Sequence, residues 1–135
     1  MVWPSAKAVY ALHAGALLAQ AYPDQLLKTR EMAASSAIPA RFLSKILGEM
    51  RRAGLISARR GYYGGYALTR PPSDVTIEEL LDAVDGADVF APLRATELAP
   101  IPLIDRLRDD LQQLAYTTLR SWSLEQLAER DPIPS

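Results

Sequence analysis

Cysteine is absent from the 135 residues, and histidine occurs once. Without thiolates the chain cannot form a disulfide, a cysteine zinc site or an iron–sulfur cluster held by its own cysteines. A single histidine, with no acid pair in a recognisable pocket pattern, leaves no assembled nucleophile and base. We therefore predict that the chain is not an enzyme and that it holds no metal or cofactor. His13, inside a predicted helix, is expected to be a packed side chain.

Long apolar runs are also missing. No stretch reaches the roughly eighteen apolar residues of a membrane span, so none is predicted. Lys7, the apolar residues 8–18 and the small residues 19–21 imitate a short signal peptide. Because Tyr10 and His13 interrupt that run, we interpret it as a buried first helix and expect a cytoplasmic protein. The length allows one packed domain with an added helix.

Charge is distributed unevenly along the chain. Residues 1–70 contain ten Lys and Arg and three Asp and Glu, which give a net charge of +7. In residues 71–135, five Arg face thirteen acids and give −8, so the whole chain carries −1. Chance segregation is the alternative explanation. The asymmetry favours a nucleic-acid surface on the first half and a solvated acidic second half.

Two short helices joined by a tight break follow the first helix, which is predicted over residues 5–21. Thr29 is the expected N-cap of a helix over residues 30–36. Ala37 and Ile38 break this helix, and Pro39 is placed in the first turn of a helix over residues 40–53. Its predicted inward face is Phe42, Leu43, Ile46, Leu47 and Met50, and its outward face is Arg41, Ser44, Lys45 and Gly48. Gly54 is predicted to end it.

A glycine-rich segment, residues 61–65, separates two strand-like pieces at 55–59 and 66–69, which predicts a β-hairpin. Thr76 and Glu79 form a capping box for a helix ending near Gly86. Three prolines mark residues 87–102 as a linker. A second capping box, residues 123–126, predicts a short final helix. The intervening helix has a coiled-coil-like apolar seam that is the candidate dimer interface: Ile104, Leu107, Leu111 and Leu114.

Two helices followed by a hairpin describe a winged helix-turn-helix that binds double-stranded DNA. Side chains on the outward row of the second helix reach base edges in the major groove, and Arg41 is the best candidate for reading guanine. Arginine in the wing suits a narrow minor groove. The predicted DNA-binding residues are Lys7, Lys28, Thr29, Arg41, Ser44, Lys45, Arg59, Arg60, Tyr62 and Tyr63. A phosphate loop is excluded because residues 61–65 match neither the Walker nor the dinucleotide spacing.

Several local patterns resemble those of the IscR/NsrR/CymR regulators, also called the Rrf-two family. They are Lys7 with Tyr10-Ala11-Leu12, Phe42-Leu43, Leu47 to Leu55 with Arg51-Arg52-Ala53-Gly54-Leu55, the tip Arg60-Gly61-Tyr62-Tyr63-Gly64-Gly65-Tyr66, and Ile77 to Gly86. These patterns cover residues 5–86, and the C-terminal helix matches more loosely. The resemblance implies a homodimer with a winged helix-turn-helix in each subunit, a long C-terminal helix that crosses to the partner, and a partly palindromic operator.

The sequence departs from this family at two places. Many relatives carry three cluster-binding cysteines in the loop before the long helix, and the corresponding residues here, roughly 87–102, contain none. We therefore expect a cluster-free member in which a small molecule or partner protein, if any, acts through this segment. Val89, Phe90 and Leu93 would line such a site, with Trp3 and Trp122 nearby; filling the junction between helices is the alternative role. Tyr63 stands where relatives often have glycine.

The sequence thus predicts a mainly α protein with a small β-hairpin, a winged helix-turn-helix followed by a long dimerisation helix. The predicted divisions are 1–86 for DNA binding, 87–102 for the linker and 103–135 for dimerisation and the last helix. The predicted function is a homodimeric transcription regulator, a repressor without an iron–sulfur cluster. A winged-helix module that binds protein is the alternative, and it would not need +7 in its first seventy residues.

Overall fold

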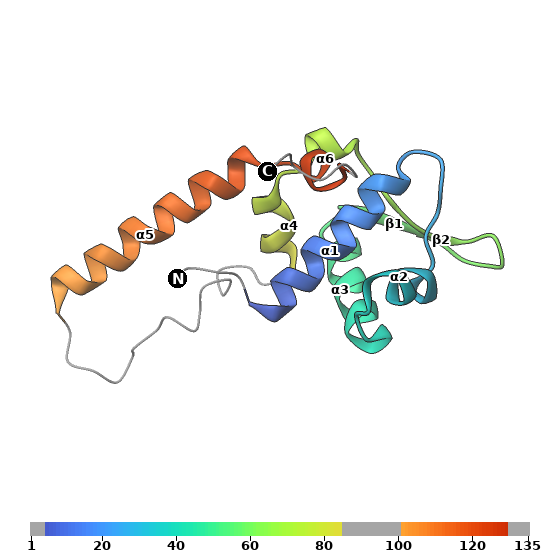
Figure 1. Ribbon diagram of the computed structural model, residues 1–135, viewed down its shortest axis with the longest axis horizontal. Helices are drawn as coiled ribbons and strands as arrows, with labels where there is room; N and C mark the ends of the chain where they lie inside the picture. The colour runs from blue at the N-terminus through green and yellow to red at the C-terminus, as the bar shows by residue number, and fades with distance from the viewer. Residues whose placement is uncertain (1–4, 85–100, 130–135) are drawn as a thin grey trace.

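The computed structural model describes residues 5–84 and 101–129. Six α-helices, one two-stranded sheet and a short 3₁₀ turn occur in these ranges (Figure 1). The elements are α1 (Ala6–Ala21), α2 (Thr29–Ser36), α3 (Ala40–Arg52), β1 (Ile56–Arg59), β2 (Gly65–Leu68), η1 (Pro72–Asp74), α4 (Ile77–Val84), α5 (Pro102–Ser121) and α6 (Leu124–Leu127). The predicted fold class is confirmed.

Helix α1 runs through the middle of the body and is covered on several sides. The Ser5 side chain accepts a hydrogen bond from the Ala8 N–H at 3.1 Å and caps the helix. Small residues on α1 let α2, α3, α4, α6 and β2 approach it. The buried residues of α1 are the small Ala8, Ala11, Ala14, Gly15, Ala19 and Ala21, together with Leu18. His13 is exposed on α1, so its predicted packed environment is wrong.

Helices α2 and α3 form the helix-turn-helix; α2 begins one residue before the predicted start, and α3 begins at Ala40 as predicted. Thr29 is the first helical residue of α2, whose N-cap is Lys28, with the Glu31 carboxylate accepting from the Lys28 N–H at 3.2 Å. Pro39 is the N-cap of α3 rather than part of its first turn. Gly54, at φ +82°, follows α3 as predicted, and the Leu55 N–H donates to the Met50 carbonyl at 3.0 Å in a Schellman closure.

Strands β1 and β2 pair in antiparallel register, with Ile56 opposite Leu68. A third segment joins this hairpin, because Leu27 exchanges two backbone hydrogen bonds with Tyr66, at 3.0 and 2.8 Å. The chain entering the helix-turn-helix therefore fixes the base of the wing. At its buried end the hairpin packs Leu55, Ile56 and Leu68 into the core.

Helix α5 extends away from the body, on the side opposite the wing (Figure 1). Only its C-terminal half packs against the core, through Ala115, Tyr116 and Leu119. The chain then returns: Ser123 pairs with Thr76, and Leu124 of α6 is fully buried against α1 and α4. The described end of the chain therefore shares the core of the winged helix. Among residues 5–84 and 101–129, no helix is long and apolar enough to cross a membrane.

Candidate nucleic-acid interface

The exposed row of α3 is held outward by the burial of its opposite face. Leu43, Ile46, Leu47 and Met50 are each at most 1% exposed, which fixes the rotation of the helix about its axis. Arg41, Ser44 and Lys45 consequently face solvent, and Gly48 is half-buried. In the turn before α3, Ala37 adopts φ +63° and the Ser36 hydroxyl accepts from the Ile38 N–H at 3.2 Å. This geometry leaves the start of α3 exposed to solvent.

Phe42 was predicted on the inward face of α3, and this is wrong. Its side chain is 42% exposed, because Phe42 lies at the edge of the buried stripe, about 40° of rotation from Ile46. The Phe42 ring stacks on Tyr10 of α1 with a centroid separation of 6.4 Å. The Arg41 guanidinium also lies over the Phe42 ring, with its Cζ 4.7 Å from the ring centroid. Phe42 therefore forms the rim between the core and the exposed row.

The wing presents two arginines and two tyrosines to solvent. Arg59 ends β1, Arg60 begins the tip, and both are exposed. Tyr62 and Tyr63 are 82% and 86% exposed and pack edge to face, with ring centroids 5.0 Å apart. The tip is closed by the Gly64 N–H, which donates to the Gly61 carbonyl at 3.0 Å.

Gly64 is required by the closeness of the two sides of the wing. A Cβ atom at this position would lie 2.0 Å from the carbonyl oxygen of Arg59. No side chain fits at that distance, so the tip has its observed shape only with glycine. The glycine at this position of the wing thus has a steric cause.

Lys28 joins the wing to the helix-turn-helix. Its ammonium group donates a hydrogen bond to the Tyr62 carbonyl and lies 5.2 Å from the centroid of the Tyr62 ring. The predicted phosphate-binding residue therefore contacts the predicted wing-tip residue, although 34 positions separate them. Thr29, the next residue, is half-buried at the start of α2.

Lys7 lies apart from the wing and is already paired. Its ammonium group is 2.9 Å from each carboxylate oxygen of Glu49, and the Glu49 side chain is only 15% exposed. This ion pair joins α1 to α3. Lys7 therefore contributes less free positive charge to the surface than its position in the sequence indicates. Carboxylates of the described residues also pair with Arg70, Arg108 and Arg120, and none with Arg41, Lys45, Arg59 or Arg60.

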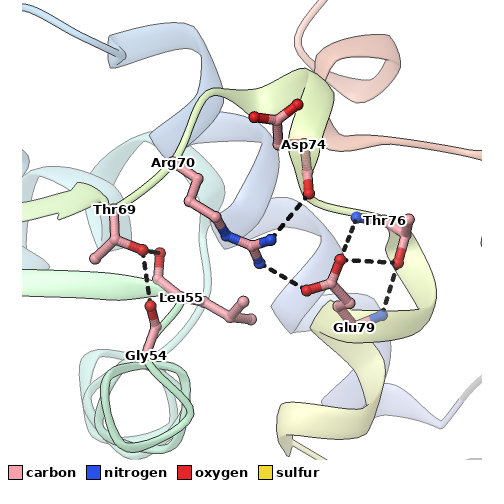
Figure 2. Close-up of polar contacts among 7 residues, drawn as sticks. All are labelled: Gly54, Leu55, Thr69, Arg70, Asp74, Thr76 and Glu79. Carbon is pink, nitrogen blue, oxygen red and sulfur yellow. Dashed lines mark hydrogen bonds and ion pairs between the residues drawn. The ribbon is translucent and has the colours of Figure 1, made fainter.

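A polar network connects α3, the wing and α4 (Figure 2). The Thr69 hydroxyl, just after β2, donates to the carbonyls of Gly54 and Leu55 at the end of α3, at 2.7 and 3.1 Å. The Arg70 guanidinium then donates to Glu79 at 2.6 Å and to the Asp74 carbonyl at 3.2 Å. The wing is thereby fixed relative to the helices on both sides of it.

Glu79 also completes the predicted capping box. Its carboxylate accepts from the Thr76 N–H at 3.4 Å, and its own N–H donates to the Thr76 hydroxyl at 3.1 Å. Hydrogen bonding to Arg70 holds the pKa of Glu79 below its usual value, against a smaller opposite effect of burial. The sequence indicated the capping box but not Arg70, because no local signal places an arginine nine residues away on the same carboxylate.

The predicted dimer seam on α5 remains exposed next to the part of the chain that the structure describes. Ile104, Leu107, Leu111 and Leu114 are 57%, 59%, 41% and 66% exposed. The other end of α5 is tied to α4 by Arg120, whose Nε donates to Glu78 at 2.6 Å. The proposed effector residues Val89, Phe90 and Leu93, together with Trp3, lie outside the described residues, and Trp122 is 41% exposed.

Within residues 5–84 and 101–129, no group of three or more His, Asp or Glu side chains could hold a metal ion. An iron–sulfur cluster with protein thiolate ligands does not fit this chain either, because the donor set is missing from the whole sequence.

Comparison with known proteins identifies relatives over nearly the whole chain. The model of the Rrf2 family, described as an iron-dependent transcriptional regulator, matches residues 4–130. A helix-turn-helix regulator sequence of Mycobacterium tuberculosis is 39% identical over 98 residues, which are 73% of this chain and 60% of that protein. The chain thus spans about three fifths of that relative's length. CymR of Bacillus subtilis is 28% identical over 125 residues, covering 92% of this chain and 88% of CymR.

Solved structures have the same architecture. The structure of Bacillus subtilis CymR, described as the global cysteine regulator, superposes with a TM-score of 0.81 at 25% identity, over 98% of this chain and all of that chain. IscR of T. potens gives a TM-score of 0.77 at 22% identity, over 97% of this chain and 91% of that chain, a likeness of fold alone. The family members are named as transcriptional regulators and not as enzymes. The chain belongs to the Rrf2 family of transcriptional regulators.

Proposed function

We propose that the chain is a sequence-specific DNA-binding regulator that acts as a homodimeric repressor in the bacterial cytoplasm. The observation that carries the proposal is a set of exposed cations without carboxylate partners among the described residues. They lie on α3 and the wing: Arg41, Lys45, Arg59 and Arg60. Helix α3 fits the major groove, and the wing arginines fit the adjacent minor groove.

Salt dependence of binding to a duplex of arbitrary sequence tests the electrostatic part. Each neutralised phosphate contributes about −0.9 to the slope of log K against log salt, so four contacts in each of the two subunits give a slope of about −7 for the dimer. Fluorescence anisotropy measures this slope. Lys45→Gln should reduce the magnitude of the dimer's slope by about 2, one contact in each subunit, whereas Arg106→Gln, at an exposed arginine of α5, should not change it. A wild-type slope near zero would favour the protein-binding module instead.

Base reading requires a second experiment, on the preferred operator selected from random DNA. Arg41→Ala should cost about 1–3 kcal/mol on that operator and relax the preference at one base pair. Equal losses on operator and random DNA would assign Arg41 to phosphate contact. The ring of Phe42 beneath the guanidinium pre-orders Arg41, and this supports the reading role.

Dimerisation would use the seam of α5. Four apolar side chains in a row, all more than 40% exposed, are unusual on a surface that stays in contact with water. A second copy of the helix would cover them and would place two wings on a partly palindromic operator, with half-sites about 34–36 Å apart. A row of leucines at steps of three and four is the pattern of helix pairing.

Any signal must reach this protein without a cysteine-bound cluster. We infer that neither oxygen nor nitric oxide changes its DNA affinity by way of such a cluster, because the chain has no thiolate ligand. The remaining routes are a small molecule or a partner protein, and the segment 88–102 stays a candidate entry point. A ligand would act by binding the DNA-competent and incompetent dimers with different affinities.

A further inference from the structure

A cavity of about 380 Å³ lies between the start of α1 and the start of α3. Its described lining is Ala6, Lys7, Tyr10, Phe42, Lys45 and Ile46. Phe42, Lys45 and Ile46 are spaced at i, i+3 and i+4, so they form one continuous strip of α3. The cavity volume falls within the range of about 300–1,000 Å³ that is typical of small-molecule sites.

The lining combines an apolar floor with a positively charged rim. Tyr10 and Phe42 supply stacked aromatic rings, and Phe42 remains 42% exposed, so part of its side chain is accessible to a ligand. Lys7 and Lys45 supply two ammonium groups. Among the described residues, the Glu49 carboxylate pairs with Lys7, and no carboxylate pairs with Lys45. The rim thus retains net positive charge.

A second cavity on α1, of about 310 Å³, provides a contrast. It is lined by Leu17, Gln20, Ala21, Gln25, Leu27, Glu31, Met32 and Ser35. This lining holds one carboxylate and no cation, so it is unsuited to an anion. Of these two cavities, the one between α1 and α3 combines an aromatic floor with a cationic rim.

We propose that this cavity, hereafter the α1–α3 pocket, binds a small organic anion with an aromatic body, such as an aromatic carboxylate. The ring would pack on Phe42 and Tyr10, and the anionic group would accept hydrogen bonds from Lys45 and Lys7. Charge-assisted hydrogen bonds of this kind are stronger than neutral ones. The aromatic body supplies most of the buried area.

The pocket shares Lys45 with the exposed row of α3. A bound anion would neutralise a cation that the proposed DNA interface uses, so the ligand and DNA would compete. This consequence rests on the proposed DNA-binding function, whereas the pocket itself does not. The ligand would therefore release the protein from DNA, as an inducer does.

The fluorescent aromatic sulfonate 1-anilinonaphthalene-8-sulfonate (ANS) is a suitable probe, because its emission rises when it enters an apolar site. Titration of the full chain should give saturable binding. Phe42→Ala and Lys45→Gln should each weaken it about tenfold, the loss expected for one charge-assisted or stacking contact. Arg52→Gln, the same charge change at an exposed position at the end of α3, should leave it unchanged. Far-UV circular dichroism establishes that each variant is folded.

Two competition experiments complete the test. Benzoate should displace ANS, and its neutral analogue benzamide should not. A DNA duplex that binds the wild type should also displace ANS. Because ANS could bind the α5 seam, the Leu107→Glu and Leu111→Glu double variant is titrated as well and should keep its affinity.

Each alternative result overturns a defined part of the proposal. Unchanged ANS affinity in both pocket variants, or loss only in the α5 variant, removes the site. Equal displacement by benzamide removes the requirement for an anion. Simultaneous binding of ANS and duplex removes the competition. Absence of duplex binding by the wild type would contradict the proposed function and leave the ANS result standing by itself.

Discussion

Leu124 tests whether the end of the chain belongs to the core of the winged helix. Its side chain is completely buried, and its N–H donates to the Val75 carbonyl at 3.0 Å. Its methyl groups lie against α1, where an added Cβ at Gly15 would be 2.9 Å from one of them. Without this side chain, α6 would lose its main apolar contact with α1 and α4.

The expected cost of Leu124→Ala is about 3 kcal/mol, inside the range of about 2–5 kcal/mol for buried leucines. The value lies below the upper limit because α6 has four residues and can move into part of the vacated space. Against a total of about 5–15 kcal/mol for a domain, this loss is easily measured. Leu127→Ala, on the same helix but half-buried, is the control and should cost about 1 kcal/mol.

The structure also predicts coupling between Leu124 and Gly15. Alone, Gly15→Ala places a methyl 2.9 Å from carbons of Leu124 and Leu80, and this overpacking costs about 1–3 kcal/mol. The gain of about 1 kcal/mol in helix propensity offsets part of it. In the Leu124→Ala background one obstruction is gone, so the same methyl enters vacated space. The double variant should be about 1 kcal/mol more stable than the sum of the single effects predicts.

Urea unfolding followed by circular dichroism, at one fixed protein concentration, measures the wild type, the three single variants and the double variant. Costs that add within about 0.5 kcal/mol would show that the two sites do not touch. A loss below about 1 kcal/mol for Leu124→Ala would show that α6 does not share the core. Either result refutes the packing described above.

Three further predictions concern the interface and its supports. Leu107→Glu with Leu111→Glu should yield monomers in light scattering and sharply weaken binding to the operator, because four carboxylates would meet at the paired seam. Gly64→Ala should force the wing tip out of its observed shape, so it should lower the free energy of unfolding by about 1–3 kcal/mol and weaken duplex binding, measured by anisotropy. Glu79→Gln should cost at most about 1 kcal/mol near neutral pH, since Glu79 and Arg70 are 40% and 42% exposed. The pKa of Glu79 is lowered, so this difference is complete above its ordinary value of 4.5 and disappears as the pH falls through the lowered value.

A defined result would contradict each of these three predictions. A dimeric double variant would move the dimer interface away from α5, and Arg106→Glu, an added negative charge at another exposed position of the same helix, is its control. Unchanged duplex affinity for the Gly64 variant would exclude the wing from the interface. A stability difference for Glu79→Gln that persists at the lowest pH would assign the effect to packing rather than to the ion pair.

Local signals in the sequence were sufficient for most of the fold. Gly54 ends α3 because glycine accepts a positive φ without strain. Thr76 and Glu79, three residues apart, satisfy each other's backbone N–H groups at the start of α4. The outward row and buried stripe of α3 follow from a period of 3.6 residues. Such features depend on neighbours within one or two turns, so they can be read from the chain itself.

Corrections and omissions arose where a residue's neighbours are far away in the sequence. The pairing of Lys7 with Glu49 and the contact of Lys28 with Tyr62 join residues 42 and 34 positions apart. Phe42 lies at the rim because Tyr10, on another helix, offers a stacking partner there.

The sequence alone determined the family resemblance, the helix-turn-helix, the glycine wing and the absence of thiolate ligands. Only the tertiary structure decided which cations remain free, how Arg70 ties the wing to α4, and that α6 returns to the core. The physical reason is that helix ends and turns are set by hydrogen bonds between near neighbours, whereas charge pairing and burial depend on which distant surfaces meet when the chain packs.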